Sequence, residues 1–149
     1  MKKNNFVGKV FITNNSKETQ KLGFDFAKIL KKGDVVCLIG ALGSGKTTFV
    51  QGLAKGLGIK NRIISPTFVI VRSYKLEVLS FYHVDLYRIE REKDVEGLGM
   101  GEIINSKNNI VIIEWAEKLG KFCPQKRIDI NFFYEKDNIR KIVFRSLNQ

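Results

Sequence analysis

Cysteine, proline and long apolar runs are scarce in this sequence, and each scarcity excludes a class of protein. The two cysteines, Cys37 and Cys123, are too far apart for the spacing of a disulfide framework or a metal-binding cluster. No apolar run approaches the roughly 20 residues that a membrane-spanning helix requires. The lysines of the amino-terminal stretch MKKNNFVGKVF are not followed by the apolar segment of a secretory signal. We therefore expect a cytoplasmic protein.

Linkers, internal repeats and low-complexity tracts are also missing from the sequence. No proline- or serine-rich segment marks a point at which two domains would divide, and 44% of the 149 residues are hydrophobic. A chain of this length and composition is long enough to bury its own core. We therefore predict a single domain over residues 1–149.

Acidic residues are in the minority, with 15 Asp and Glu against 26 Lys and Arg, for a net charge of +11. A basic balance of this size favours contact with the phosphates of a nucleotide or an RNA, or with an acidic protein. The lysines are spread along the chain and form no dense arm, so a solvated surface also accounts for them. Charge alone therefore leaves nucleic-acid binding open.

Hydrophobic periodicity predicts an α/β fold. The runs DVVCLIG and NIVIIEW are continuously apolar, as strands buried on both faces of a parallel sheet are. Helical spacing follows the Asn15–Glu18 capping pattern up to Gly33, and the helix after Lys46 should end at Gly58. We expect three layers around a mixed, largely parallel central sheet. The other expected elements are a strand at 9–13, an antiparallel pair at 67–74 and 77–87, a short helix or ordered loop at 93–105, and a hairpin over 127–147 that turns at 135–138.

The stretch GALGSGKTTFV contains the phosphate-binding loop pattern G-x-x-x-x-G-K-[ST], with Gly40, Gly45, Lys46 and Thr47 at its fixed positions. A strand is expected before it and a helix after it, which is the context that the pattern requires. The glycines let backbone N–H groups turn toward phosphate oxygens, and the helix directs its positive end to the same place. Lys46 adds a charge for the β- and γ-phosphates, and the Thr47 hydroxyl is suited to Mg²⁺. The sequence therefore predicts a nucleoside triphosphate site.

Phosphoryl transfer needs further groups, and three residues are candidates for them. Glu114 ends a buried strand, which is the arrangement of a Walker B carboxylate. Asp85 ends another strand and is expected at the same edge of the sheet. Thr67 follows Pro66 at the junction of a loop and a strand, where its hydroxyl could close onto the metal or the γ-phosphate. Each of these residues could instead be an ordinary polar residue at a strand end.

Four segments taken together resemble the bacterial TsaE family, the small ATPases of tRNA threonylcarbamoyladenosine biosynthesis. They are GALGSGKTTFVQGL, SPTF, YHVDLYR and IEWAEKLG, in this order over roughly residues 13–140. The resemblance implies a P-loop NTPase-like fold and ATP hydrolysis that is weak in isolation. It also implies a complex of the chain with a threonylcarbamoyl transferase subunit and the inactive paralogue of that subunit. This complex would modify adenosine 37 of tRNA, and the chain would contact tRNA indirectly or at the surface of the complex.

The resemblance also implies roles for individual residues. Lys46, Thr67, Asp85 and Glu114 would form the catalytic set, with Thr67 as a switch and Thr47 and Glu114 on Mg²⁺. The second loop position is usually acidic in this family, but here it is Ala41. A role of that acid in steering the loop or a partner is therefore in doubt, whereas the phosphate cradle relies on backbone. The residues implied to bind ATP are Gly40, Leu42, Gly43, Ser44, Gly45, Lys46, Thr47, Thr48 and Trp115.

Other conspicuous residues have more than one interpretation. His83, the only histidine, could fill the core, face a partner or take part in catalysis, and Trp115 could cap the nucleotide or fill the core. Tyr87 and Arg88 could bind a partner or brace the site. Arg140 and the segment 13–19 could approach the adenine or ribose. The guanine-reading pattern NKxD does not occur in the sequence, which favours ATP over GTP.

Two other functions remain alternatives. A nucleoside or small-molecule kinase shares the phosphate loop and the size, although neither an arginine-rich lid nor an acceptor pocket is recognisable. A nucleic-acid-binding module with a degenerate phosphate loop is the second. Labelled phosphoryl transfer to nucleosides would identify the kinase, and RNA binding that ignores both ATP and Lys46→Ala would identify the binding module.

Overall fold

A seven-stranded sheet in the order β1-β7-β6-β2-β5-β4-β3 forms the centre of the molecule. The computed structural model describes residues 2–63 and 70–147. Strands β6, β2, β5 and β4 run parallel. At the edges β7 and β3 pair antiparallel with β6 and β4, and β1 pairs antiparallel with β7. The mixed, largely parallel sheet is thereby confirmed. The elements are η1 (Lys3–Asn5), β1 (Val10–Thr13), α1 (Ser16–Ala27), β2 (Val35–Ile39), α2 (Lys46–Gly56), β3 (Val71–Lys75), β4 (Ser80–Asp85), α3 (Glu92–Glu96), α4 (Met100–Asn105), β5 (Asn109–Glu114), η2 (Ala116–Phe122), β6 (Arg127–Tyr134) and β7 (Arg140–Leu147).

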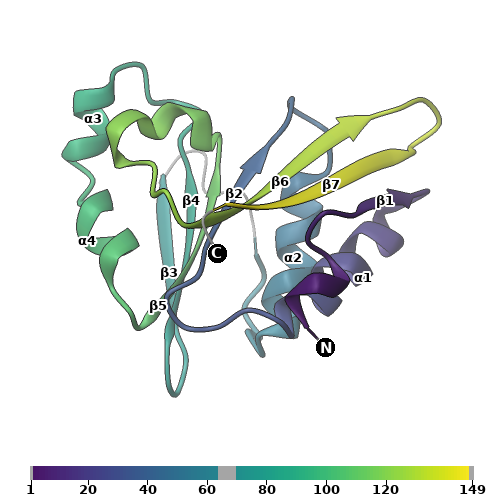
Figure 1. Cartoon of the computed structure of the whole chain (residues 1–149), viewed down its shortest axis with the longest axis horizontal. Coiled ribbons are helices and arrows are strands. Elements are labelled where there is room, and N and C mark those ends of the chain that lie inside the picture. Colours follow the sequence, from purple (N-terminus) through teal and green to yellow (C-terminus); the bar gives the residue numbers. More distant parts are fainter. Residues whose placement is uncertain (1, 64–69, 148–149) are drawn as a thin grey trace.

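Helices α1 and α2 cover one face of the sheet, and α3, α4 and η2 lie on the other (Figure 1). Successive side chains of a strand point to opposite faces, so each buried strand contributes to two cores. Val36 and Leu38 of β2 pack toward α1 and α2, whereas Val35 and Cys37 pack on the opposite side. This explains why β2 and β5 are apolar throughout, and it confirms the three-layer α/β fold.

The pair α1 and α2 is packed closely because glycines face the contact. A Cβ atom added to Gly52 would lie 1.9 Å from the carbonyl oxygen of Gln20, and one added to Gly23 would lie 2.2 Å from that of Phe49. No side chain fits in such a space, so the two helix backbones approach each other directly. Since α2 begins at the phosphate loop, this contact fixes the direction in which its amino end points.

The start of α1 and, to within two residues, the end of α2 agree with the sequence prediction, whereas the end of α1 differs from it. The Asn15 side chain accepts a hydrogen bond from the Glu18 N–H at 2.9 Å, as the capping pattern predicts. Helix α2 ends at Gly56, two residues before the expected Gly58, and Gly58 closes it in a Schellman motif with bonds from the N–H groups of Gly58 and Ile59 back to the last turn. The expected continuation of α1 to Gly33 is wrong. After Ala27 the chain forms tight turns, which preserve the apolar spacing without a regular helix.

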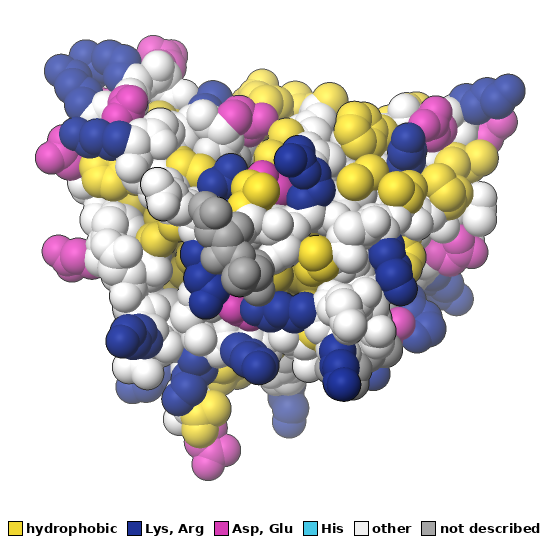
Figure 2. Space-filling model, in the orientation of Figure 1, with side chains coloured by type: hydrophobic (Ala, Val, Ile, Leu, Met, Phe, Trp, Pro, Cys, Tyr) yellow, Lys and Arg dark blue, Asp and Glu magenta, His cyan; other side chains and the backbone are white. Residues whose placement is uncertain are grey.

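Further expectations are confirmed along the rest of the chain. The segment 93–105 forms the two short helices α3 and α4, and the strands β6 and β7 form the closing hairpin. Strands β3 and β4 are antiparallel, but residues 67–69 of the first expected strand lie outside the described residues. Within residues 2–63 and 70–147, no helix is both long and apolar enough to cross a membrane. On the face in Figure 2, Lys and Arg side chains are scattered among acidic and apolar ones, as their spread in the sequence suggests.

Candidate functional site

The loop between β2 and α2 brings backbone N–H groups and a lysine to one point. Gly45, the residue before α2, has a φ of +106°, a conformation that glycine adopts without the strain that a Cβ atom causes. The first N–H groups of α2 have no carbonyl partner within their own helix. The Lys46 ammonium donates to the carbonyl oxygen of Gly40, and so the side chain folds back over the loop. The conformation of Gly45 and the position of Lys46 agree with a phosphate-binding loop, which stays a prediction.

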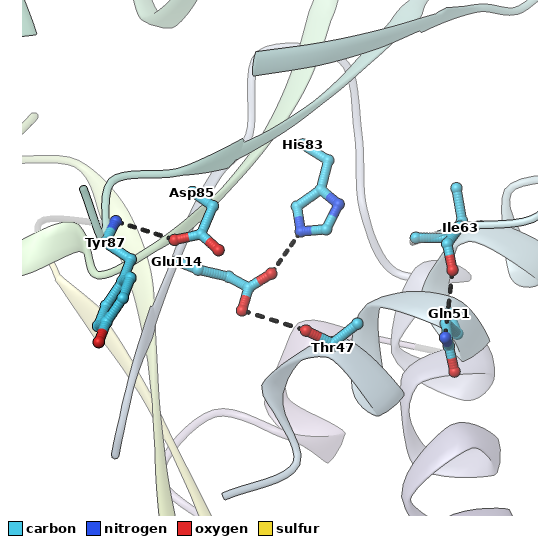
Figure 3. A network of polar contacts seen from close by, with 7 residues as sticks. All are labelled: Thr47, Gln51, Ile63, His83, Asp85, Tyr87 and Glu114. Carbon is cyan, nitrogen blue, oxygen red and sulfur yellow. Dashed lines mark hydrogen bonds and ion pairs between the residues drawn. The ribbon is translucent and has the colours of Figure 1, made fainter. Parts of the chain in front are cut away.

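Two carboxylates stand at the carboxyl edge of the sheet. Asp85 of β4 and Glu114 of β5 are direct neighbours in the parallel register, and both side chains point to the face that α2 covers (Figure 3). Both are almost fully buried. The Asp85 carboxylate accepts the N–H of Tyr87 at 2.9 Å, which anchors the turn after β4. The sequence interpretation of two strand-end acids at one edge is thereby confirmed in its geometry.

The Glu114 carboxylate has two different polar neighbours. Its Oε1 atom lies 3.5 Å from the Thr47 hydroxyl at the start of α2. Its Oε2 atom lies 2.6 Å from Nε2 of His83, a histidine with no exposed surface (Figure 3). The carboxylate thus links the phosphate loop helix to the interior of the sheet. The sequence did not predict this contact between Glu114 and His83.

A cavity of about 180 Å³ opens beside these groups. Trp115 follows Glu114 directly, and its ring centroid lies 4.2 Å from the Lys46 ammonium. Burial lowers the pKa of Lys46, and the negative charges of Glu114, Glu117 and Asp85 oppose that shift. The residues that line the cavity are Leu42, Gly43, Gly45, Lys46, Thr47, Thr48, Asp85, Glu114, Trp115 and Arg140.

A second cavity, of about 190 Å³, shares Gly45, Thr48 and Arg140 with the first. Arg140 borders both cavities, and its guanidinium donates to the carbonyl oxygen of Gly43 at 3.2 Å. The lining otherwise consists of neutral residues from the start of α1, from α2 and from the β6–β7 turn. These are Asn15, Ser16, Thr19, Gly45, Thr48 and Asn138. The suggestion that Arg140 and the segment 13–19 approach the same part of a nucleotide agrees with this arrangement.

The donors at the loop fit a polyphosphate. Ser44 Oγ and the Nε and Nη1 atoms of Arg140 are buried without a hydrogen-bond partner among the described residues. Buried donors without partners are unfavourable, so a ligand with several acceptor oxygens would stabilise them. The described residues contain no group of three or more His, Cys, Asp or Glu that could hold a metal alone. Mg²⁺ commonly binds through one or two protein ligands together with substrate phosphates, so Thr47 and Glu114 fit it with a nucleotide.

The remaining predicted residues have varied outcomes. Thr67, the expected switch, lies outside the described residues. The Tyr87 ring packs against Trp115, with centroids 5.3 Å apart, which supports a bracing role. Ser16, which lines the second cavity, belongs to the predicted segment 13–19, whereas Asn138, which lines it too, was not among the predicted site residues. Asn138 belongs to no recognisable motif, and only the fold places it beside the cavity.

Comparison with known proteins identifies relatives over most of the chain. Residues 13–142 match the family model described as threonylcarbamoyl adenosine biosynthesis protein TsaE. The tRNA threonylcarbamoyladenosine biosynthesis protein TsaE of Bacillus subtilis is 40% identical over 91% of this chain and 84% of its own. The TsaE protein of Treponema pallidum is 35% identical over 88% of this chain and 96% of its own. The crystal structure of B. subtilis YdiB matches with a TM-score of 0.80 and 34% identity, covering 94% of this chain and 86% of that one.

Proposed function

The chain belongs to the TsaE family, and from that premise we propose that it is an ATPase of tRNA threonylcarbamoyladenosine biosynthesis. The modified nucleotide would be adenosine 37. The observation that carries the proposal is the convergence of an intact phosphate loop with Asp85 and Glu114 in one cavity. A degenerate loop would not need two buried carboxylates beside its lysine, because burying charge without a partner is costly.

The chain's own residues supply the binding and orienting groups. Backbone N–H groups of residues 43–48 would surround the β- and γ-phosphates, and Lys46 would leave the Gly40 carbonyl to neutralise their charge. Arg140 would contribute the donors that are now without partners. The second, neutral cavity would take the ribose and adenine. Trp115 would cover the phosphate side and limit the access of water.

Metal binding would rest on Thr47 and Glu114. The Thr47 hydroxyl and the Glu114 Oε1 atom are already neighbours at 3.5 Å, so one ion could be held by both with little rearrangement. Mg²⁺ bound there would neutralise the negative charge that builds up on the phosphates. The carboxylate of Asp85, which lies beside Glu114 on the neighbouring strand β4, would orient the attacking water. Glu114 is a second candidate for that role.

The family assignment also suggests how the ATPase is used. We expect weak hydrolysis by the isolated chain and full activity with the threonylcarbamoyl transferase subunit and its inactive paralogue. Thr67 would close onto the γ-phosphate side and open after hydrolysis, an order–disorder switch that partners can sense. ATP turnover would then reset the complex between rounds of tRNA modification.

Reconstituted tRNA threonylcarbamoylation tests the proposal. The purified chain and both partner proteins are mixed with tRNA and ATP, and modification is measured in a single round and over many rounds. Omitting the chain should stop multiple rounds, and Thr67→Ala should reduce them while sparing the first. Equal modification without the chain would overturn the proposal. Transfer of labelled phosphate to a nucleoside, or ATP-independent RNA binding, would favour the two alternative functions instead.

A further inference from the structure

We propose that His83 is a positioning residue, which holds the Glu114 carboxylate so that one oxygen remains directed at Thr47 and the metal–nucleotide site. This inference rests on the proposed function, because it assigns His83 a part in preparing that site. His83 does not line the cavity beside Lys46 and Trp115, so its action on a bound nucleotide would pass through Glu114.

The strand register brings the two residues together. His83 precedes Asp85 by two positions on β4, so both side chains lie on the face that carries Glu114 on β5. Nε2 of His83 reaches Oε2 of Glu114 at 2.6 Å, a close hydrogen-bond contact between a ring nitrogen and a carboxylate oxygen. Both side chains are withdrawn from solvent, so water does not compete for the contact.

The pattern of donors fixes what His83 can do. An ionised carboxylate only accepts hydrogen bonds, so Nε2 of His83 must carry the hydrogen of this contact. Nδ1 of His83 is buried without a partner among the described residues. The neutral ring with its hydrogen on Nε2 leaves no buried N–H unpaired, whereas the opposite tautomer would leave one on Nδ1 and place two acceptors against each other. The structure therefore assigns the Nε2–H tautomer.

A purely packing role does not account for this residue. Its direct neighbour in β5 is Ile112, and the preceding positions of the same face, Phe81 and Ile110, are apolar. A valine or isoleucine would fill such a position without the cost of burying an imidazole. The ring is matched instead to one oxygen of Glu114. With Oε2 held by His83, rotation of the carboxylate is restricted, and Oε1 stays on the Thr47 side.

The expected consequence concerns metal binding more than nucleotide binding. Residues that orient a metal ligand typically change metal affinity by about 10- to 100-fold when they are removed. The Lys46 ammonium bonds to the Gly40 carbonyl, whereas His83 bonds to Glu114, so the affinity for metal-free ATP should depend little on His83. This separation distinguishes a positioning residue from one that only supports the fold.

Two matched substitutions test the proposal. His83→Gln places an amide N–H near the position of Nε2, whereas the shorter amide of His83→Asn does not reach Glu114. Trp115, the only tryptophan, reports binding by its fluorescence because it lies against Lys46. We expect His83→Asn to raise the Mg²⁺ concentration for half-maximal binding at fixed ATP by about 10-fold or more. His83→Gln should stay near the wild-type value, and both variants should bind ATP in EDTA within about twofold of wild type. Equal Mg²⁺ dependence in all three proteins, or equal losses in both variants, would overturn the proposal.

A second measurement needs no nucleotide. Because His83 is the only histidine, a long-range ¹H–¹⁵N spectrum of the ligand-free protein contains a single imidazole from the chain itself. We expect the neutral Nε2–H tautomer, with a shift of its nitrogen signals in Glu114→Gln. An Nδ1–H tautomer would overturn the contact. If the spectrum is as expected but the wild-type protein binds no ATP, the proposed function fails while the His83–Glu114 contact stands.

Discussion

The two cavities that Gly45 lines have similar volumes and different chemistry. The cavity beside Trp115 is lined by Lys46 and two buried carboxylates, whereas the cavity beside α1 has neutral side chains and only the shared Arg140. Charged groups are placed where a polyphosphate and a metal would lie, and neutral ones where a base and sugar would lie. The difference indicates that one ligand with a charged and an uncharged end would occupy both cavities.

The cavities also differ in how they are assembled. Most of the charged cavity comes from the loop before α2 and from the ends of β4 and β5. The neutral cavity combines the start of α1, the start of α2 and the β6–β7 turn. Loss of charge in the first should therefore affect binding and chemistry strongly. Changes in the second should be milder and should depend on the nucleoside part of the ligand.

The largest effect is expected from Lys46→Ala. Removing the only cationic side chain of the loop should weaken ATP binding by at least about 3 kcal/mol, or more than about 100-fold, and should also slow hydrolysis. Titration of Trp115 fluorescence with ATP measures the affinity. Lys55→Ala, an exposed lysine near the far end of the same helix, is the control and should bind normally. A Lys46→Ala protein with wild-type affinity and turnover would contradict the phosphate-loop assignment.

Removing charge from the carboxylates should separate binding from chemistry. Glu114→Gln and Asp85→Asn should retain measurable ATP affinity but lower hydrolysis in the assembled complex by about 10²–10³-fold. Phosphate release at saturating ATP is the measurement. Glu96→Gln, an exposed acid on α3, serves as the control. Wild-type rates in both variants would remove the carboxylates from the mechanism.

A smaller effect is expected where the cavities meet. Arg140→Ala removes one hydrogen bond to the Gly43 carbonyl and two donors without partners, and should weaken ATP binding by about 1–2 kcal/mol, or roughly 10-fold. Arg145→Ala, exposed on the same strand, is the matched control. Comparing ATP with inorganic tripolyphosphate shows whether the neutral cavity takes part. If it does, ATP binds more tightly than tripolyphosphate to the wild-type protein; identical affinities would contradict that role.

The smallest effect on nucleotide binding is expected from the opposite face of the sheet. There a hydrogen bond from Cys37, together with the charge of Arg127, lowers the pKa of Cys123, against burial and Asp129, which raise it. Cys123 should therefore react as a thiolate at a lower pH than an ordinary cysteine and should lose reactivity as the pH falls through its lowered pKa. Iodoacetamide labelling followed by mass spectrometry should find Cys123 modified and Cys37 protected. Cys37→Ala should move the reactivity midpoint of Cys123 upward. An unchanged midpoint would rule out the hydrogen bond as its cause.

The elements that the sequence predicts well are those with strong local patterns. The run before the loop, the glycines and Lys46 specify β2, the turn and the start of α2 without help from distant residues. The neighbour relation of Asp85 and Glu114 also follows, because strand ends of a parallel sheet share one edge. The continuation of α1 beyond Ala27 was predicted wrongly, since turns and helices can share the same apolar spacing.

Other features depend on contacts between residues that are far apart in the sequence. Arg140 meets the carbonyl of Gly43 across 97 positions, and no local pattern encodes that approach. His83 could be interpreted as core, partner-facing or catalytic, because its partner was unknown until the register of β4 against β5 was seen. Propensity describes single elements, whereas these contacts are set by the order of the strands in the sheet.

That strand order has a consequence for the folding of the chain during synthesis. Strand β2 leaves the ribosome early, yet its neighbours β5 and β6 begin at Asn109 and Arg127, and β1 must wait for β7. Pairings between such distant segments close large loops, which makes folding slow and late. A nascent chain that ends before Arg140 leaves the edge of β6 without its partner β7 and lacks Arg140, the residue that borders both cavities. Dependence on a chaperone should therefore be greatest for these incomplete chains, and release from it should coincide with the first appearance of nucleotide affinity.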